Sequence, residues 1–143
     1  MAADLSEFDL SSREGLQAML DITPIHRWLG FEVSEFDAEQ GTLTLVCSAD
    51  GNASRFDGAP QSHGGALATL IDSAATFACS AAIGRPVPTM NIRVDYLRPA
   101  AGPRLEAYAL VVKKGRTVSL VDVRVMSGGK LVAIGRCGQA TGS

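Results

Sequence analysis

The spacing of apolar residues divides the chain into two regions that meet near Gly84. Between residues 63 and 83 nearly every position is apolar or small, and neither Gly nor Pro follows Gly65 within this run. Such a segment predicts one long helix that is buried on nearly every side. After Gly84 apolar residues recur at every second position, which is typical of strands. We therefore expect a buried helix followed by a sheet.

Two short helices are predicted before this run. Residues 11–14 have the spacing of a capping box. Thr23-Pro24 and Gly30 indicate the start and the end of a second helix. Residues 1–30 thus form an N-terminal helical segment. Its apolar residues at helical spacing are Leu16, Met19 and Leu20 in the first helix, and Ile25, Trp28 and Leu29 in the second.

Strand patterns occupy most of the remaining chain. Two predicted strands, residues 31–36 and 42–48, precede the long helix, and residues 49–62 form a loop rich in Gly, Asn, Asp, Pro and Ser. Four more strands follow the helix, and their short connections predict an antiparallel meander. Their expected ranges are 89–98, 105–113, 118–126 and 131–137.

This order of elements predicts an α+β fold. An antiparallel sheet of about six strands is near the usual size, and curling it around the one apolar helix would bury both. At 143 residues the chain has the length of one ordinary domain. A single domain over residues 1–143 is therefore expected.

The charge balance excludes one broad class of function. Thirteen Lys and Arg residues stand against fifteen Asp and Glu, a formal charge of −2, and the densest basic cluster is residues 113–116. A nucleic-acid-binding protein would show a broad basic face. We therefore expect no nucleic-acid partner.

The termini and the cysteines predict a cytoplasmic protein. The acidic N-terminus lacks the apolar core of a signal peptide, and no segment is expected to reach the length needed to span a membrane. Cys47, Cys79 and Cys137 are odd in number and form no Cys-x-x-Cys pair. Free thiols in a reducing compartment follow. With only two histidines, no metal-ligand spacing is present either.

One carboxylate in the apolar helix requires an explanation. Asp72 lies within the run, and Thr76 follows one turn later on the same face. The helix opens with His63-Gly64-Gly65, where the first turn leaves backbone N–H groups without helical partners. An acid beside a hydroxyl, on a helix that begins with bare amides, indicates a functional site.

Helix geometry limits how that site can be assembled. Gly64 and Asp72 are eight residues apart, so roughly 12 Å separates them along the helix axis. One reacting carbonyl cannot contact both residues of the same helix. If the Gly64 N–H polarises a carbonyl and Asp72 acts as acid, base or nucleophile, the two must come from different subunits. The site then requires a two-fold dimer.

The pattern His63-Gly64-Gly65, six residues, then Asp72-Ser73-Ala74 resembles the signature of hotdog-fold acyl-CoA thioesterases of the phenylacetic-acid-degradation (PaaI-like) type. Residues 96–100 resemble the strand end of that family, and residues 114–117 its following turn. The resemblance covers residues 31–140 approximately. It implies a hotdog fold, in which an antiparallel sheet wraps around one long central helix.

The resemblance also implies roles for individual residues. Asp72 would attack a thioester carbonyl or activate water to do so, and the Gly64 amide of the neighbouring subunit would polarise the carbonyl oxygen. Thr76 would hold the attacking water, although a threonine inside a helix also commonly bonds back to a carbonyl of the preceding turn. His63 would position the thioester or brace the loop.

One position departs from the family pattern. Six residues before the motif histidine the family usually has Asn or Gln, and this chain has Asp57. An ionised carboxylate cannot donate a hydrogen bond. Either Asp57 points elsewhere, or Gln61 or Asn52 takes the role, or the activity is altered.

The implied substrate is an acyl-CoA, with aryl-acyl-CoA included. Coenzyme A is part of that substrate, so no separate cofactor is expected. The implied assembly is a homodimer or homotetramer with the active site at the subunit interface. The residues expected to contact the substrate are Gly65, Gln61, Arg93, Arg98 and Arg116.

Hydrolysis of acyl-CoA thioesters to the free acid and coenzyme A is the predicted function. Two alternatives remain at this stage. A non-catalytic acyl-CoA binder or sensor would follow if Asp57 disables hydrolysis. A hydratase or dehydratase of the same fold is suggested by the loop at residues 56–60, but those enzymes need a His beside the acid where this chain has Phe56.

Overall fold

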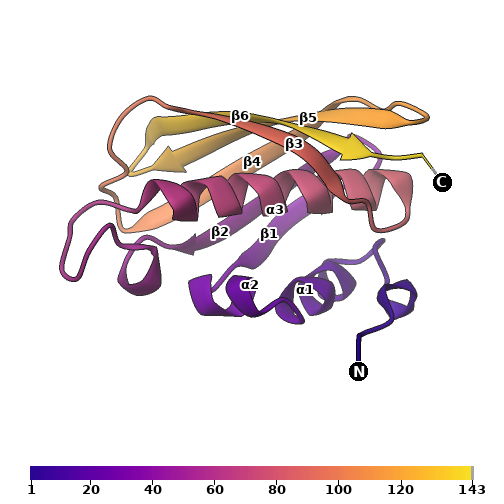
Figure 1. The fold of residues 1–143 in the computed structure, drawn as a ribbon, viewed down its shortest axis with the longest axis horizontal. Coiled ribbons are helices and arrows are strands. Elements are labelled where there is room, and N and C mark those ends of the chain that lie inside the picture. Colours follow the sequence, from indigo (N-terminus) through magenta and orange to yellow (C-terminus); the bar gives the residue numbers. More distant parts are fainter. Residues whose placement is uncertain (143) are drawn as a thin grey trace.

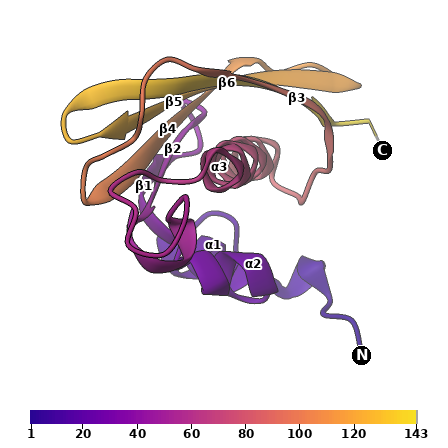
Figure 2. The ribbon, with the colours of Figure 1, turned by 60° about the vertical axis from the view of Figure 1, so that its left-hand side comes forward.

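The computed structural model describes residues 1–142, which form a six-stranded antiparallel sheet curled around one long helix, α3 (Gly64–Ile83) (Figure 1). Two short helices, α1 (Arg13–Asp21) and α2 (Pro24–Leu29), lie on the side of α3 that the sheet leaves open (Figure 2). The predicted helix-in-sheet architecture is confirmed. The strands are β1 (Glu32–Asp37), β2 (Thr42–Ser48), β3 (Thr89–Tyr96), β4 (Arg104–Lys113), β5 (Val118–Ser127) and β6 (Lys130–Ala140).

The ends of α3 are set by the residues that the sequence indicated. His63 is the N-cap, and its Nδ1 accepts a 2.8 Å hydrogen bond from the Gly65 N–H. Gly84 ends the helix in the left-handed region, at φ 88°, where glycine is the favoured residue. Leu70 and Ile71 near the helix centre are 0% exposed. Burial of such side chains by the sheet is the main stabilising term for a helix of this kind.

One expectation about α3 is wrong. With 20 residues and a mean hydropathy of 1.6, α3 is long and apolar enough to span a membrane by length and composition. The sheet covers it instead, and 61% of the apolar window is buried inside the protein. The core helix of a folded domain can be as long and as apolar as a membrane-spanning helix, because apolar side chains of the same protein surround it. The cytoplasmic location stays a prediction.

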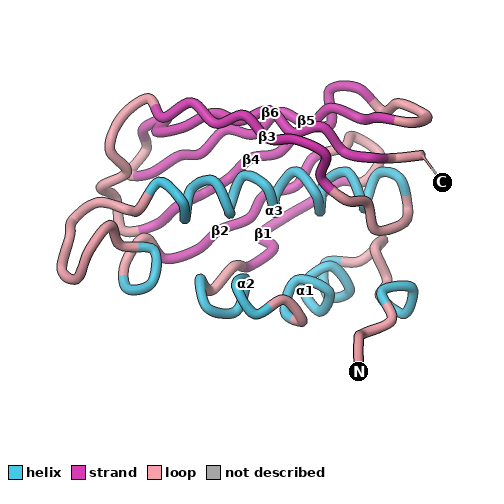
Figure 3. The backbone as a smooth tube through the Cα atoms, viewed as in Figure 1, coloured by secondary structure: helices cyan, strands magenta, loops and turns pink. Residues whose placement is uncertain are grey.

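The strand order differs from the predicted meander. The sheet of residues 1–142 runs β1-β2-β4-β5-β6-β3 (Figure 3), so of the four strands after α3 only β4, β5 and β6 follow one another as neighbours. β3 pairs with β6 at one edge, and β4 pairs with β2. The connection between β3 and β4 contains Pro99 and Pro103, which lack the N–H group that a tight hairpin would use. The chain therefore crosses the end of the curled sheet there rather than turning back.

β3 forms an edge of the sheet and is exposed along most of its length. Met90 is 59% exposed, Ile92 41% and Tyr96 54%. The pairing register with β6 shifts between Thr89 and Asn91, which marks a β-bulge. An uncovered edge strand with apolar side chains is a template for pairing with another strand.

The face that α2 buries also differs from the prediction. Ile25, Trp28 and Leu29 were expected to share one apolar face of the helix, but Ile25 and Trp28 are 45% and 58% exposed whereas Leu29 is buried. His26 is buried beside Leu29 instead. Its ring stacks on Phe31 at 5.5 Å between centroids, and both of its nitrogens have hydrogen-bond partners. A histidine with both nitrogens bonded can replace an apolar residue in such a position.

Candidate active site

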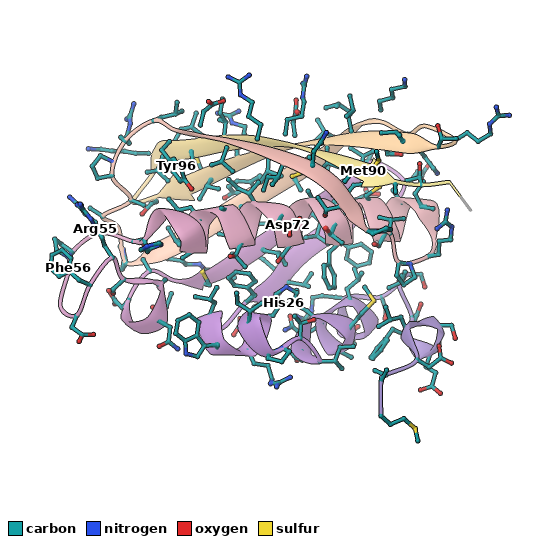
Figure 4. The ribbon with its side chains drawn as sticks, in the orientation of Figure 1. His26, Arg55, Phe56, Asp72, Met90 and Tyr96 are labelled. Carbon is teal, nitrogen blue, oxygen red and sulfur yellow. The ribbon has the colours of Figure 1, made fainter. Side chains whose placement is uncertain are left out.

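Asp72 lies in the middle of α3, and its side chain is partly buried (Figure 4). Asp72 Oδ1 accepts a 2.7 Å hydrogen bond from the Thr89 hydroxyl at the start of β3. Hydrogen bonds to a charged acceptor are short and strong. One carboxylate oxygen is thus held in place, and the other carries no hydrogen bond to any residue from 1 to 142.

Thr76 joins the same cluster. Its Oγ1 lies 2.9 Å from Thr89 Oγ1. A hydroxyl group has one proton, and that of Thr89 goes to Asp72, so Thr76 is the donor to Thr89. Asp72 and Thr76 therefore share one helix face, as their spacing predicted, and the Thr76 hydroxyl faces β3 rather than the carbonyl one turn back.

Thr89 was not expected at the site, and the bulge in β3 explains why. Strict alternation places Thr89 on the same face as Asn91 and Arg93, away from the helix. The register shift between Thr89 and Asn91 turns the Thr89 side chain to the helix face. One signal in the sequence could have indicated it: Thr89 is a hydroxyl residue that directly follows the short connection from α3 to the next strand.

The N-terminus of α3 opens into a second part of the site. A cleft of about 440 Å³ is lined by His63 and Gly64 together with residues from the segment after β3. Within residues 1–142 the Gly64 N–H has no hydrogen-bond acceptor, whereas the Gly65 N–H is used by the His63 ring. His63 therefore caps α3, while the Gly64 N–H is left without an acceptor in the same part of the chain. The role predicted for His63 toward a substrate stays a prediction.

β3 connects both parts of the site. At its start Thr89 contacts Asp72, and at its end the Tyr96 hydroxyl donates a 2.7 Å hydrogen bond to the Gly64 carbonyl. Figure 4 shows Tyr96 near the N-terminal end of α3 and Asp72 farther along the helix. Because α3 is unbroken from Gly64 to Ile83, the separation of roughly 12 Å between Gly64 and Asp72 holds.

The loop before α3 distinguishes the three candidates for the Asn or Gln position. Asp57 is exposed next to Gly58 and does not line the cleft. Asn52 donates a 2.6 Å hydrogen bond to the Trp28 carbonyl. Gln61 lines the cleft beside Gly64, and its Oε1 accepts a 3.4 Å hydrogen bond from Arg55. Of the three, Gln61 is the residue that lines the same cleft as Gly64.

The predicted substrate-binding residues divide into two groups. Gln61 and Arg98 line the cleft at Gly64, and Gly65 forms the adjacent turn of α3. Arg93 lies on β3 and pairs with Asp95 at 3.2 Å, on the far face of the sheet from that cleft. Arg116 lies in the turn between β4 and β5 and is exposed. Within one subunit, Arg93 and Arg116 do not reach the Gly64 cleft.

His26 was also not identified from the sequence. Its Nε2 lies 2.9 Å from the Ser73 hydroxyl, directly after Asp72, and its Nδ1 lies 2.9 Å from the Leu20 carbonyl. Since a carbonyl only accepts, Nδ1 carries the proton and Nε2 accepts from Ser73. Burial lowers the pKa of His26 below its ordinary value. His26 thus ties α1 and α2 to the helix that carries Asp72.

This arrangement has the components of acyl transfer to water. A held carboxylate with one free oxygen can accept a proton or attack a carbonyl, and a free amide at a helix N-terminus can stabilise a developing oxyanion. A family model for the thioesterase superfamily matches residues 62–134, more than half of the chain. The chain belongs to the thioesterase superfamily. That match spans His63, Gly64, Asp72, Thr76 and Thr89.

Individual members of the thioesterase superfamily resemble most of the chain. Acyl-coenzyme A thioesterase 13 from Homo sapiens is 30% identical over 131 residues, which cover 88% of this chain and 91% of the human protein. Acyl-coenzyme A thioesterase PaaI from Escherichia coli K12 is 26% identical over 115 residues, covering 80% and 79% of the two chains.

Solved thioesterase-superfamily structures match the fold. The E. coli PaaI protein from the phenylacetic acid degradation operon has a TM-score of 0.76 and 27% identity, over 92% of this chain and 94% of PaaI. A mutant PaaI from Thermus thermophilus has a TM-score of 0.71 and 31% identity, over 82% and 98% of the chains. The predicted hotdog fold and the PaaI-like resemblance are confirmed.

Proposed function

We propose that this thioesterase-superfamily protein hydrolyses acyl-CoA thioesters, with Asp72 of one subunit and the Gly64 N–H of its partner acting on the same carbonyl. The named relatives support the substrate class, since both the human and the E. coli protein are acyl-coenzyme A thioesterases. The position of each group within the chain supports the division between subunits.

The observation that carries the proposal is the contact of β3 with both parts of the site. Thr89 at its start touches Asp72, and Tyr96 at its end touches Gly64. When two antiparallel strands pair across a two-fold axis, the start of one lies beside the end of the other. Pairing of the exposed β3 edges would therefore bring Asp72 of one subunit toward Gly64 of the other.

The proposed reaction needs few groups because a thioester carbonyl is a good electrophile with a readily departing thiolate. The partner's Gly64 N–H donates to the carbonyl oxygen and stabilises its negative charge in the tetrahedral intermediate. A single preorganised donor of this type contributes about 3 kcal/mol. Thr89 holds Oδ1 of Asp72, so Oδ2 is the oxygen that takes the proton of the attacking water or attacks the carbonyl itself.

The cleft at Gly64 supports a role in holding the coenzyme A portion. Arg55 and Arg98 line it with Gln61, and guanidinium groups bind phosphate oxygens through two parallel hydrogen bonds. Arg93 and Arg116 would contribute only from the partner subunit. A second dimer packed on the first would give the homotetramer, which leaves each two-subunit site unchanged.

A thiol-release assay with purified protein tests the proposed activity. The panel contains acetyl-, hexanoyl-, palmitoyl-, benzoyl- and phenylacetyl-CoA, because the operon of the E. coli relative concerns phenylacetic acid degradation. Release of one coenzyme A per acid formed supports hydrolysis, and the ranking of kcat/KM gives the acyl preference. Binding of all these esters without thiol release contradicts it and supports an acyl-CoA sensor. In that case Asp57→Asn tests whether the loop carboxylate is the cause.

A further inference from the structure

Gln139 is a fully buried polar residue beside the proposed catalytic cluster. It lies on β6, paired with Thr89 of β3 on one side and with Ser119 of β5 on the other. Its Oε1 is 3.3 Å from Thr89 Oγ1. Within residues 1–142 its Nε2 is buried without a hydrogen-bond partner. A buried unpaired donor is costly, so its presence beside Thr89 requires a reason.

The contacts of the Thr89 hydroxyl decide how this amide is oriented. The single proton of Thr89 has two possible acceptors, Asp72 Oδ1 at 2.7 Å and Gln139 Oε1 at 3.3 Å. The shorter bond to an ionised carboxylate is the stronger one. With that proton on Asp72, an amide oxygen facing Thr89 has no proton to accept. A half-turn of the Gln139 amide exchanges its oxygen and nitrogen and turns the same contact into a hydrogen bond.

We propose that Gln139 is a positioning residue for Asp72: its amide nitrogen donates to Thr89 and thereby fixes the Thr89 proton on the carboxylate. Thr76 and Gln139 then occupy both lone pairs of the Thr89 oxygen. Thr89 is left with one function, which is to donate to Asp72. The Gln139 oxygen becomes the unpaired atom, and proteins tolerate an under-satisfied carbonyl better than an orphaned N–H group.

The inference rests on the proposed function, because it specifies how the base form of Asp72 is stabilised. When Asp72 is protonated, the chain of bonds reverses. Asp72 then donates to Thr89, and Thr89 donates to the oxygen of Gln139. An amide can serve both arrangements. An ionised carboxylate at position 139 can only accept from Thr89, so it fits only the arrangement in which Asp72 is protonated. His26 and Cys137 are the titratable groups that interact with the Asp72 charge, and the substitution leaves both unchanged, so the identity of residue 139 itself alters the pH dependence of activity.

The test compares the pH dependence of kcat/KM in wild type, Gln139→Glu and Gln139→Met. In Gln139→Glu the protonated carboxyl can donate to Thr89 as the amide does, and its ionisation at higher pH removes that donor, so kcat/KM should fall on the alkaline side of the profile, where wild type shows no such loss. In Gln139→Met kcat/KM at neutral pH should fall roughly fivefold, as expected for one lost hydrogen bond. In a Thr89→Val background, Gln139→Met should have no further effect.

Gln17→Met is the matched control. Gln17 also makes structural hydrogen bonds, accepting from the Val33 N–H at 2.7 Å and donating to the Phe31 carbonyl at 3.2 Å, but it lies in α1. It should change thermal stability without moving the pH profile. An unchanged profile in Gln139→Glu, or losses from Gln139→Met and Thr89→Val that simply multiply, would overturn the inference.

A second measurement does not depend on activity or on the folding of any variant. If Nε2 faces Thr89 in the wild-type protein near neutral pH, NMR cross-relaxation should connect a side-chain amide proton of Gln139 with the Thr89 methyl group and Hβ. Cross-relaxation of the amide protons with other residues only would overturn the inference. This result stands even if the protein hydrolyses no thioester, in which case the proposed function fails separately.

Discussion

The Thr89 hydroxyl lies 2.7 Å from Asp72 Oδ1 and donates its proton to that oxygen. The two residues come from different elements, the middle of α3 and the start of β3. Their contact selects which carboxylate oxygen remains free for chemistry. It also links the edge strand, through which a partner subunit would pair, to the carboxylate that would act on the substrate.

Replacement of Thr89 by Val should reduce thioester hydrolysis while leaving the fold intact. A hydrogen bond to a charged group contributes about 1.5–3 kcal/mol, so we expect kcat/KM to fall roughly 10- to 100-fold. Thr76→Val should cost less, roughly fivefold, because Thr76 contacts Thr89 rather than the carboxylate. Steady-state kinetics and circular dichroism on both variants measure this. Wild-type kcat/KM in Thr89→Val would contradict the assigned contact.

Proline at position 64 should remove the proposed oxyanion donor with little damage to the helix. Gly64 is the first residue of α3, where proline is well tolerated, and His63 already has the extended conformation that precedes proline, at φ −70° and ψ 137°. Gly64→Pro should lower kcat about 100-fold or more. Gly64→Ala is the control, since it keeps the N–H and places its Cβ 3.2 Å from the Tyr96 ring. Equal kcat in the two variants would contradict the role of the amide.

The buried imidazole of His26 should make the protein less stable in mild acid. Burial lowers the pKa of His26 in the folded state below its unfolded value of about 6.5. The unfolded chain therefore binds more protons as pH falls through 6.5, and the free energy of unfolding decreases with it. Above that pH the full stability is present. Urea unfolding at pH 7.5 and 5.5 should show a larger loss for wild type than for His26→Gln, and equal losses would contradict this account.

The fold was largely predictable because its strongest signals are local. The apolar run with its Gly-Gly opening and Gly84 fixed α3, and period-two alternation located the strands. The strand order was not predictable in the same way, because β3 and β6 pair over a long sequence separation. The prolines after β3 disfavour a tight hairpin between β3 and β4, but they do not indicate which strand β3 pairs with instead. Local patterns do not record which distant edge a strand joins.

The site was predicted in part for a related reason. Gly64, Asp72 and Thr76 share one helix and His63 caps it, so their spacing along the sequence places them. Thr89 depends on a bulge that reverses the alternation of β3. The buried face of α2 depends on the His26 ring, which bonds to the Leu20 carbonyl and the Ser73 hydroxyl. The spacing of apolar residues does not indicate these polar contacts.

The protein's own thiols should not interfere with a disulfide reagent that detects released coenzyme A. All three cysteines are free and buried. Burial raises the pKa of Cys47 to about 11 and that of Cys137 to about 12, and it also raises the pKa of Cys79. Since the thiolate is the reactive form, native protein should react slowly at pH 8. Urea should expose three thiols per chain, and rapid reaction before unfolding would contradict the described core.

Mixing two inactive variants tests the shared active site most directly. Asp72→Asn and Gly64→Pro should each be nearly inactive alone. A heterodimer of the two contains one site with both Asp72 and the Gly64 N–H, and one site with neither. Unfolding and refolding an equal mixture should therefore restore about a quarter of the wild-type activity, given random pairing of subunits. A mixture no more active than its components, with dimers formed normally, would contradict a site shared between subunits.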